Sequence, residues 1–218
     1  MKRKLWVVFL VLMALDLSGC KFGRGIAGSG NRKTEKREVK TFNAIDSSGA
    51  YNINVTCQKA ASFEIEADDN ILPLIKTEVR DGTLFVSNDQ EFHSSKIPSL
   101  RITVPDLAKL TNSGAGTVSI VDANSKQLDL NLTGAASIDA GGNAKSVTIS
   151  STGAGKIDAG KLHAEKARVS VSGAASVDVY ATEQLDVDIS GVSQVSYGGN
   201  PKVVNKNISG VGSVNPKT

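Results

Sequence analysis

Three aspartates at a regular interval are the residues of this sequence best placed to do chemistry. Asp139, Asp158 and Asp178 each stand five residues after the glycine of a recurring triplet, which consists of a hydroxyl residue, a glycine and a small residue. If the chain repeats its path at that interval, the three carboxylates form one column. Aligned carboxylates can hold calcium, or act as acid and base on a glycosidic bond.

The same column fits a solvent-exposed face. Each aspartate follows a large apolar residue, so on a strand it points away from the side that the apolar residue buries. Like charges on such a face are tolerated because water and salt screen them. We therefore expect a solvated row without catalytic residues, with weak cation or glycan contact at the three aspartates as the alternative. The corresponding residues of other repeats are Ser119, Ser196 and Asn215.

Other chemically active residues are scattered. His93 and His163 lie in different segments, and no Cys-x-x-Cys or His-x-x-His spacing occurs, so the sequence predicts no zinc site. Cys57 is the only cysteine besides Cys20, and we interpret it as a small strand residue rather than a nucleophile. We expect no cofactor and no enzymatic activity.

Cys20 ends a different pattern at the N-terminus. Lys2, Arg3 and Lys4 precede an apolar run from 5 to 15, which is too short to cross a bilayer core of roughly 30 Å. The four residues 17–20, Leu-Ser-Gly-Cys, resemble the bacterial lipobox, which is cleaved before a lipid-bearing cysteine. We expect a signal peptide over 1–19 and membrane attachment through lipid on Cys20; an ordinary secretory peptide with an incidental cysteine is the alternative. Lys21, in place of an aspartate that retains lipoproteins at the inner membrane, favours the outer membrane.

The charge is divided between the start and the remainder of the mature chain. Residues 21–40 hold seven basic and two acidic side chains, and glycine is frequent between 23 and 30. This composition predicts a flexible basic linker over 20–38, followed by a folded domain over 39–218. The domain is mildly acidic and poor in aromatic residues, which argues against nucleic-acid binding.

The triplet organises that domain as an internal repeat. Its glycines are 20, 19, 20, 18 and 19 residues apart, and an apolar residue stands four positions after each of them. Another copy, Ser48–Ala50, precedes the first of these triplets by 65 residues. The repeats are Ser113–Ala115, Thr133–Ala135, Thr152–Ala154, Ser172–Ala174, Ser190–Val192 and Ser209–Val211.

Within the repeats, apolar and polar residues alternate, as in 128–132 and 185–189, which indicates strands buried on one face. A unit of about 19 residues is too short to form its own core, so the units must stack. We predict an all-β, single-stranded parallel β-helix, or solenoid, with one unit per coil. An antiparallel β-sandwich with one hairpin per unit is the alternative; the absence of Asn-Gly and Asp-Gly turns in these repeats disfavours it.

The region before Gly114 has weaker spacing. We expect strands over 62–67, 83–86 and 100–104, and either a short helix or an irregular loop over 71–79.

Three features of the sequence together resemble the bacterial family DUF2807, the auto-transporter adhesin, head GIN domain. They are the run 39–45 leading to Gly49, the segment 76–84, and the later Ser-Gly-Ala repeats. The resemblance covers roughly 35–204 and implies a β-helical surface or periplasmic protein. It transfers no catalytic residues.

Two functional classes follow from these observations. The favoured one is a lipid-anchored, non-catalytic protein of the bacterial cell envelope, whose repetitive face binds glycan or an envelope or host surface protein. The alternative is a carbohydrate-active β-helix enzyme or a cation-dependent glycan binder that uses Asp139, Asp158 and Asp178. The two differ in whether carboxylates pair across a cleft.

Overall fold

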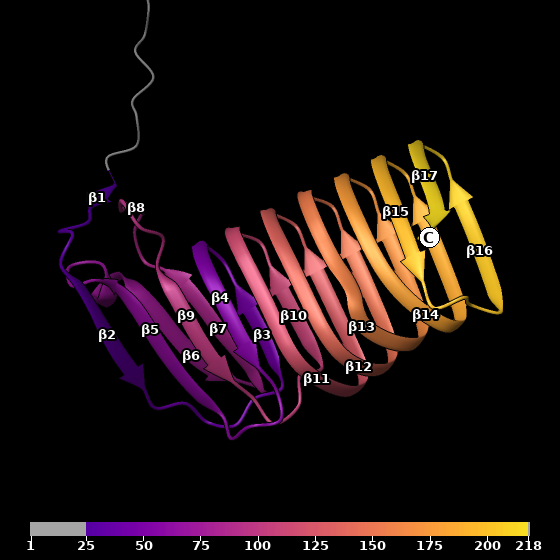
Figure 1. Cartoon of the computed structure of the whole chain (residues 1–218). Helices are drawn as coiled ribbons and strands as arrows, with labels where there is room; N and C mark the ends of the chain where they lie inside the picture. Colours follow the sequence, from indigo (N-terminus) through magenta and orange to yellow (C-terminus); the bar gives the residue numbers. More distant parts are fainter. Residues whose placement is uncertain (1–24, 218) are drawn as a thin grey trace, which may run out of the picture.

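The protein is a parallel β-solenoid in which successive coils stack along one axis (Figure 1). The computed structural model describes residues 25–217, and Cys20 and the expected signal peptide lie outside the described residues. Four long strands each run almost once around the coil, and each pairs in parallel with the next. The β-helix prediction is confirmed and the sandwich is not supported. The four strands are β11 (Ala115–Leu132), β12 (Ala135–Ser151), β13 (Ala154–Val171) and β14 (Ala174–Ile189).

The register between coils follows the predicted alignment. The apolar residues four positions after each glycine stack into one buried row, and a second row runs through the positions four residues before each glycine. In each row an apolar side chain packs against the equivalent side chain of the next coil. The shared core excludes water along the axis. The first row is Val118, Ile138, Ile157, Val177, Val195 and Val214.

The C-terminal end of the solenoid consists of one coil, formed by β15 (Val192–Gly198) and β16 (Val203–Ile208), and of β17 (Val211–Pro216), which begins the next coil. β15 and β16 both pair with β14, and β17 pairs with β15. Lys206 takes the place of an apolar residue in the second row. Its Nζ donates a hydrogen bond to the carbonyl oxygen of Val214 at 2.8 Å and lies 5.5 Å from the centre of the Tyr197 ring.

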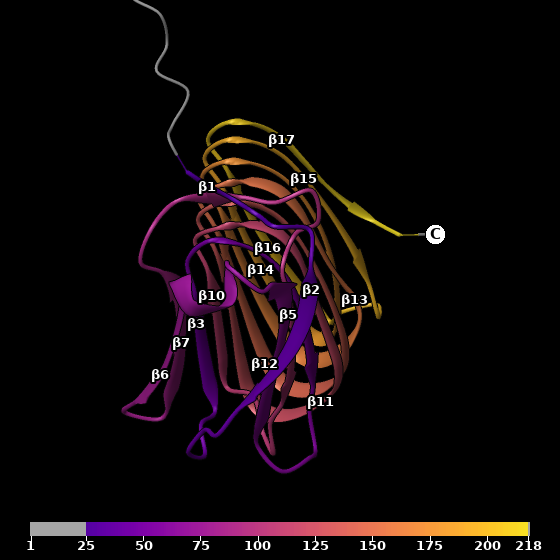
Figure 2. The same ribbon diagram turned by 90° about the vertical axis from the view of Figure 1, so that its left-hand side faces the viewer.

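The first coil is interrupted by a long insertion. β3 (Ala44–Ser47) and β4 (Ala50–Thr56) pair in parallel with β10 (Lys109–Asn112) and β11, so the early triplet at Gly49 does belong to the repeat. The inserted segments extend the sheet of the solenoid as two branches, ordered β4-β9-β5-β2 and β3-β7-β6. Figure 2 shows the two branches on opposite sides of the coil axis. The inserted elements are β5 (Ser62–Asp68), the 3₁₀ turn η1 (Leu72–Leu74), β6 (Ile75–Arg80), β7 (Thr83–Asn88), β8 (Phe92–His93) and β9 (Ser99–Thr103).

These elements confirm the three strands that we expected before Gly114. The segment 71–79, for which we left helix or loop open, is the short 3₁₀ turn followed by strand β6. Pro73 fits the first turn of η1, where its missing N–H costs no hydrogen bond. Within residues 25–217, no helix is long and apolar enough to cross a membrane.

The predicted linker over 20–38 is wrong from Ile26 onward. β1 (Ile26–Ala27) pairs in parallel with β8, and β2 (Arg32–Arg37) pairs antiparallel with β5 along its whole length. The sequence of β2, Arg-Lys-Thr-Glu-Lys-Arg, has no apolar alternation, which is why it looked unstructured. Its partner β5 supplies the acidic side chains that its cations face, in the pairs Arg32–Glu66, Arg32–Asp68 and Lys36–Glu64.

Candidate binding surface

The three repeat aspartates do form one row. Asp139 pairs in register with Asp158, and Asp158 pairs with Asp178. Their side chains lie on the outer surface: Asp139 is exposed and the other two are partly buried. Ser119 and Ser196 continue the row on either side.

Lysines compensate the charge of this row. Lys156 Nζ lies 3.3 Å from Asp158 Oδ2, and Lys217 Nζ lies 3.6 Å from Asp178 Oδ2. Partial burial acts to raise the pKa of Asp158. The hydrogen bonds from the Gly160 N–H and Lys156, together with the charges of Lys156 and Lys217, outweigh it and hold that pKa below its usual value.

No group of three or more His, Cys, Asp or Glu side chains in the described part of the chain is arranged to hold a metal ion. Within the row, Asp158 and Asp178 take part in ion pairs on the surface.

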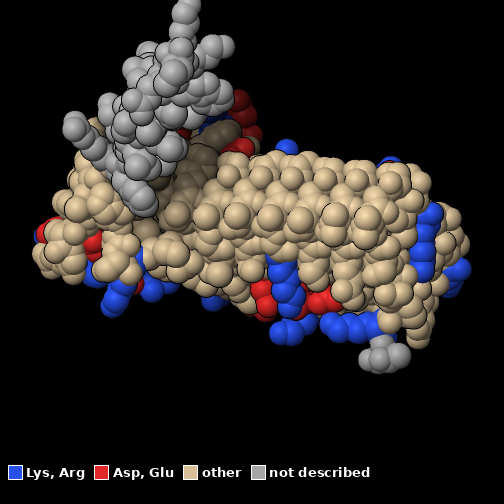
Figure 3. Space-filling view, turned by 90° about the horizontal axis from the view of Figure 1, so that it is seen from above, with Lys and Arg blue, Asp and Glu red and all other residues tan. Residues whose placement is uncertain are grey.

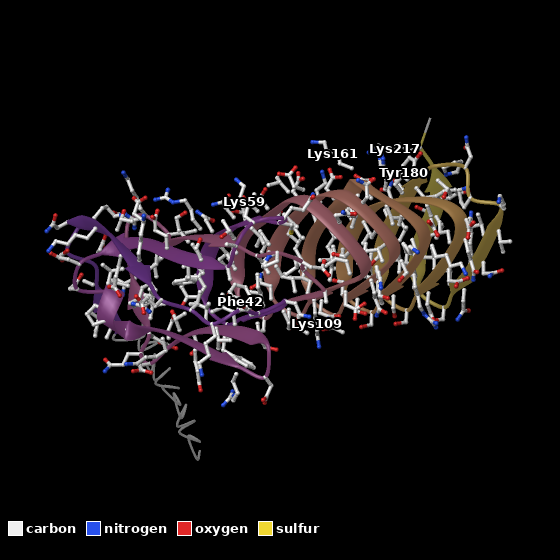
Figure 4. The ribbon with its side chains drawn as sticks, turned by 90° about the horizontal axis from the view of Figure 1, so that it is seen from below. Phe42, Lys59, Lys109, Lys161, Tyr180 and Lys217 are labelled. Atoms are coloured by element: carbon white, nitrogen blue, oxygen red, sulfur yellow. The ribbon has the colours of Figure 1, made fainter. Side chains whose placement is uncertain are left out.

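The aromatic side chains near the row pack against each other, and the thiol of Cys57 is buried. His163 stacks on Tyr180, with ring centres 4.5 Å apart. Figure 4 shows Tyr180, Lys161 and Lys217 on one edge of the solenoid, and Lys109 on the opposite edge. Cys57 is buried as expected of a small apolar residue, but it lies one position after the end of β4 and not within the strand.

One groove of the surface was not anticipated from the sequence. A groove of about 840 Å³ lies where the end of β2 meets the outer side of β4, β5 and β9. Figure 2 shows β2 beside β5 at this end of the molecule. The groove-lining residues are Lys36, Arg37, Glu38, Val39, Asn54, Thr56, Ala61, Ser62, Phe63, Glu64, Arg101, Ile102 and Thr103.

Two cations converge on one carboxylate in the groove. Arg101 Nε and Nη2 both lie 2.6 Å from Glu64 Oε1, and Lys36 Nζ lies 3.9 Å from Glu64 Oε2. Arg37 is occupied elsewhere, because it donates to the carbonyl oxygens of Leu72 and Ile75. The Glu64 side chain is 24% exposed, whereas that of Lys36 is 84% exposed and can reach a ligand.

The groove and the aspartate row belong to the same line of register across the sheet. Lys36 pairs with Glu64, Glu64 with Arg101, and Arg101 with Asn54. Asn54 in turn pairs with Ser119, which pairs with Asp139. One outward-facing row therefore runs from a cationic end to an acidic middle. The alternation of polar and apolar residues along each strand could have identified the outward-facing residues. The sequence near each inserted strand does not indicate which strands are its antiparallel neighbours, so the groove could not be predicted.

Comparison with known protein families identifies the family of this chain. Residues 41–201 match DUF2807, described as "Putative auto-transporter adhesin, head GIN domain". The chain belongs to this family. The family description indicates a cell-envelope or surface protein with an adhesin-like role.

Solved structures support the fold of this DUF2807 domain. A structure described as a putative adhesin from Bacteroides fragilis is 28% identical, with a TM-score of 0.74, and the match covers 88% of this chain and 100% of that one. A structure described as a putative lipid binding protein from Parabacteroides distasonis is 21% identical, with a TM-score of 0.58 and coverages of 89% and 100%. No curated protein sequence matches the chain.

The triplet side of the head GIN domain contrasts with the groove. In Figure 3 a broad face along the coils is free of Lys, Arg, Asp and Glu. This is the side on which the coils turn at their glycines, and the small residue after each glycine is exposed, as Ala135 and Ala154 illustrate.

Proposed function

We propose that this protein is a lipid-anchored, non-catalytic binding protein of the bacterial cell envelope. Lipid on Cys20 holds it to a membrane, with the outer membrane favoured by Lys21, and the solenoid displays a surface to a glycan or to an envelope or host protein. The membership of the adhesin family supports the adhesin-like role, and the lipobox-like residues 17–20 support the anchor.

The observation that carries the anchor proposal is the lipobox-like sequence 17–20, Leu-Ser-Gly-Cys, at the end of the apolar run. The first described strand, β1, begins at Ile26, so five residues, 21–25, separate the lipid-bearing position from it. A fully extended chain covers at most about 3.6 Å per residue, which places β1 within about 22 Å of the lipidated cysteine. Two or three acyl chains anchor a protein firmly where one does not. The domain would therefore be held close to the bilayer rather than on a long stalk.

Globomycin treatment and mass measurement of the N-terminus test the anchor. We expect a mature chain that starts at Cys20 with diacylglyceryl, and accumulation of the unprocessed precursor in treated cells. The variant Cys20→Ala is the matched control and should lose the lipid mass. A mature N-terminus elsewhere, without lipid, would refute the anchor. Protease shaving of intact cells then distinguishes a surface-exposed domain from a periplasmic one.

The second candidate is a cation-dependent glycan binder or a carbohydrate-active enzyme, which the register of Asp139, Asp158 and Asp178 favours. The ion pairs with Lys156 and Lys217 weigh against it, because a cation must displace both lysines. Calcium titration followed by the thermal midpoint tests it. We expect no rise in the midpoint, and the same absence of response in Asp158→Asn.

A further inference from the structure

We propose that the groove between the end of β2 and the strands β4, β5 and β9 binds an acidic saccharide. This inference deepens the proposed function, since it names a ligand class for the adhesin-like domain, and it does not depend on the lipid. It rests on the dimensions of the groove, its charges and its free hydrogen-bonding groups.

The groove is the right size for a few sugar rings. Small-molecule sites in proteins occupy about 300–1,000 Å³, and this groove of about 840 Å³ lies in that range. It is partly open to solvent rather than enclosed, so a sugar chain can enter it from the surface. Its sides also offer small apolar surface at Val39 and Ala61, against which the carbon face of a pyranose can rest.

Within the groove, the cluster of Lys36, Arg101 and Glu64 favours an anion, whereas the exposed carboxylate of Glu38 opposes one. Lys36 and Arg101 share the single carboxylate of Glu64, so the cluster carries one surplus positive charge. Arg101 uses only Nε and Nη2 on Glu64, which leaves Nη1 free to donate to a ligand. A carboxylate or sulfate placed between Lys36 and Arg101 would complete the neutralisation of the cluster. Glu38, also in the lining, is exposed and makes no ion pair among residues 25–217.

Polar side chains without partners line the floor. Asn54 and Thr56 point outward from β4, and within the described chain neither side chain makes a hydrogen bond. Ser62 Oγ lies 2.7 Å from Thr103 Oγ1, and Thr103 in turn donates to the carbonyl oxygen of Ala60, so Ser62 Oγ retains capacity to accept from a ligand. Amide and hydroxyl groups set beside cations match the alternating hydroxyl and acid groups of an acidic saccharide.

Protein or peptide ligands are less suited, because the described groove lacks a large exposed apolar residue to anchor them.

Isothermal titration of the full-length chain in detergent micelles tests the proposal, with pentagalacturonate and its fully methyl-esterified form as matched probes. A heparin-derived tetrasaccharide serves as the sulfate arm. We expect at least one acidic probe to bind, and the uncharged ester to bind roughly tenfold or more weakly because it lacks the carboxylates. Inorganic phosphate at equal ionic strength should not displace the saccharide; complete displacement would mean a site for a simple anion and would overturn the saccharide assignment.

Substitutions assign the binding to the groove. Lys36→Gln and Arg101→Gln should each weaken it about fivefold, whereas Glu38→Gln should strengthen it by removing a repelling charge. Lys109→Gln, which alters an exposed lysine on the opposite edge, is the control and should bind as the wild type does (Figure 4). Failure of both acidic probes to bind, equal binding of acid and ester, or equal losses in the control would overturn the groove proposal. None of these results bears on the mass of the N-terminus, so the anchor is tested independently.

Discussion

A Cβ atom added to Gly134 would lie 1.8 Å from the carbonyl oxygen of Gly114, one coil earlier. A Cβ atom added to Gly153 would likewise lie 2.0 Å from the carbonyl oxygen of Gly134. These glycines do not have positive φ values, so their requirement is the close approach of two backbones rather than an unusual conformation. The hydrogen bonds from the Ala135 N–H to Gly114 O and from the Ala154 N–H to Gly134 O, both 3.1 Å, hold the coils at that separation.

Gly153→Ala should therefore destabilise the solenoid strongly. The methyl group cannot be accommodated unless the coils separate, and backbone cannot move aside as a flexible side chain can. We expect a loss of about 3 kcal/mol or more, measured as a fall in the denaturation midpoint. Gly141→Ala is the matched control, because its Cβ would meet Lys161 Cβ at an ordinary 3.6 Å. Equal midpoints for the two variants would contradict the packing argument.

This close approach explains why the repeated part of the fold could be predicted from the sequence. Each coil needs a glycine at the turn and an apolar residue four positions later, so the constraint recurs at about 19 residues and is visible without an alignment. The outward direction of Asp139, Asp158 and Asp178 followed from the same alternation. The ion pair of Asp178 with Lys217 did not, because that lysine is 39 positions after Asp178 in the sequence.

The N-terminal part could not be predicted in the same way, because its order depends on contacts between distant segments. β2 is a strand only because β5 offers it hydrogen bonds and opposite charges, and the two strands are antiparallel neighbours at 26 to 36 residues of separation. The groove likewise depends on contacts between segments that are distant in the sequence. Lys36, Glu64 and Arg101 come from three strands, and no spacing in the sequence indicates that they meet.

Ile157→Ala tests the buried row. Ile157 is fully buried, and removing its side chain leaves a cavity between Ile138 and Val177 in the adjacent coils. Such substitutions cost about 2–5 kcal/mol. The exposed neighbour Asp139→Asn is the control and should change the stability by less than about 0.5 kcal/mol. Urea unfolding of both variants measures the difference, and a small loss for Ile157→Ala would mean that the coils do not share a packed core.

The thiol of Cys57 should be unreactive in the folded protein. Burial, followed by the charges of Asp106 and Asp122, raises its pKa to about 11, so the reactive thiolate is scarce at pH 8. Reaction of the mature protein with a disulfide reagent should be slow until a denaturant is added, and should then reveal one thiol if Cys20 carries lipid. Rapid reaction of Cys57 before unfolding, identified by peptide mass, would contradict its burial.

Acid should release the N-terminal segment from the body of the protein. Ser29 Oγ and Asn31 Nδ2 donate to the two carboxylate oxygens of Asp69 at 2.6 and 2.7 Å, and these bonds, from Ser29 first and then Asn31, lower the pKa of Asp69. A carboxyl group with a lowered pKa stabilises the folded state above its unfolded pKa of 3.8, and that contribution disappears as the pH falls through the folded value.

The amide protons of residues 26–32 report this release in NMR spectra recorded from pH 6 downward. We expect them to remain protected until the pH is below about 3.8 and then to exchange faster than those of the coils, because only this segment depends on Asp69. Asp69→Asn should show faster exchange already at pH 6, whereas Asp81→Asn, in the turn between β6 and β7, should not. If Asp69→Asn leaves the exchange unchanged, the other contacts of the segment hold it without Asp69, among them the pairing of β1 with β8 and of β2 with β5. Its attachment would then be independent of the titration of Asp69.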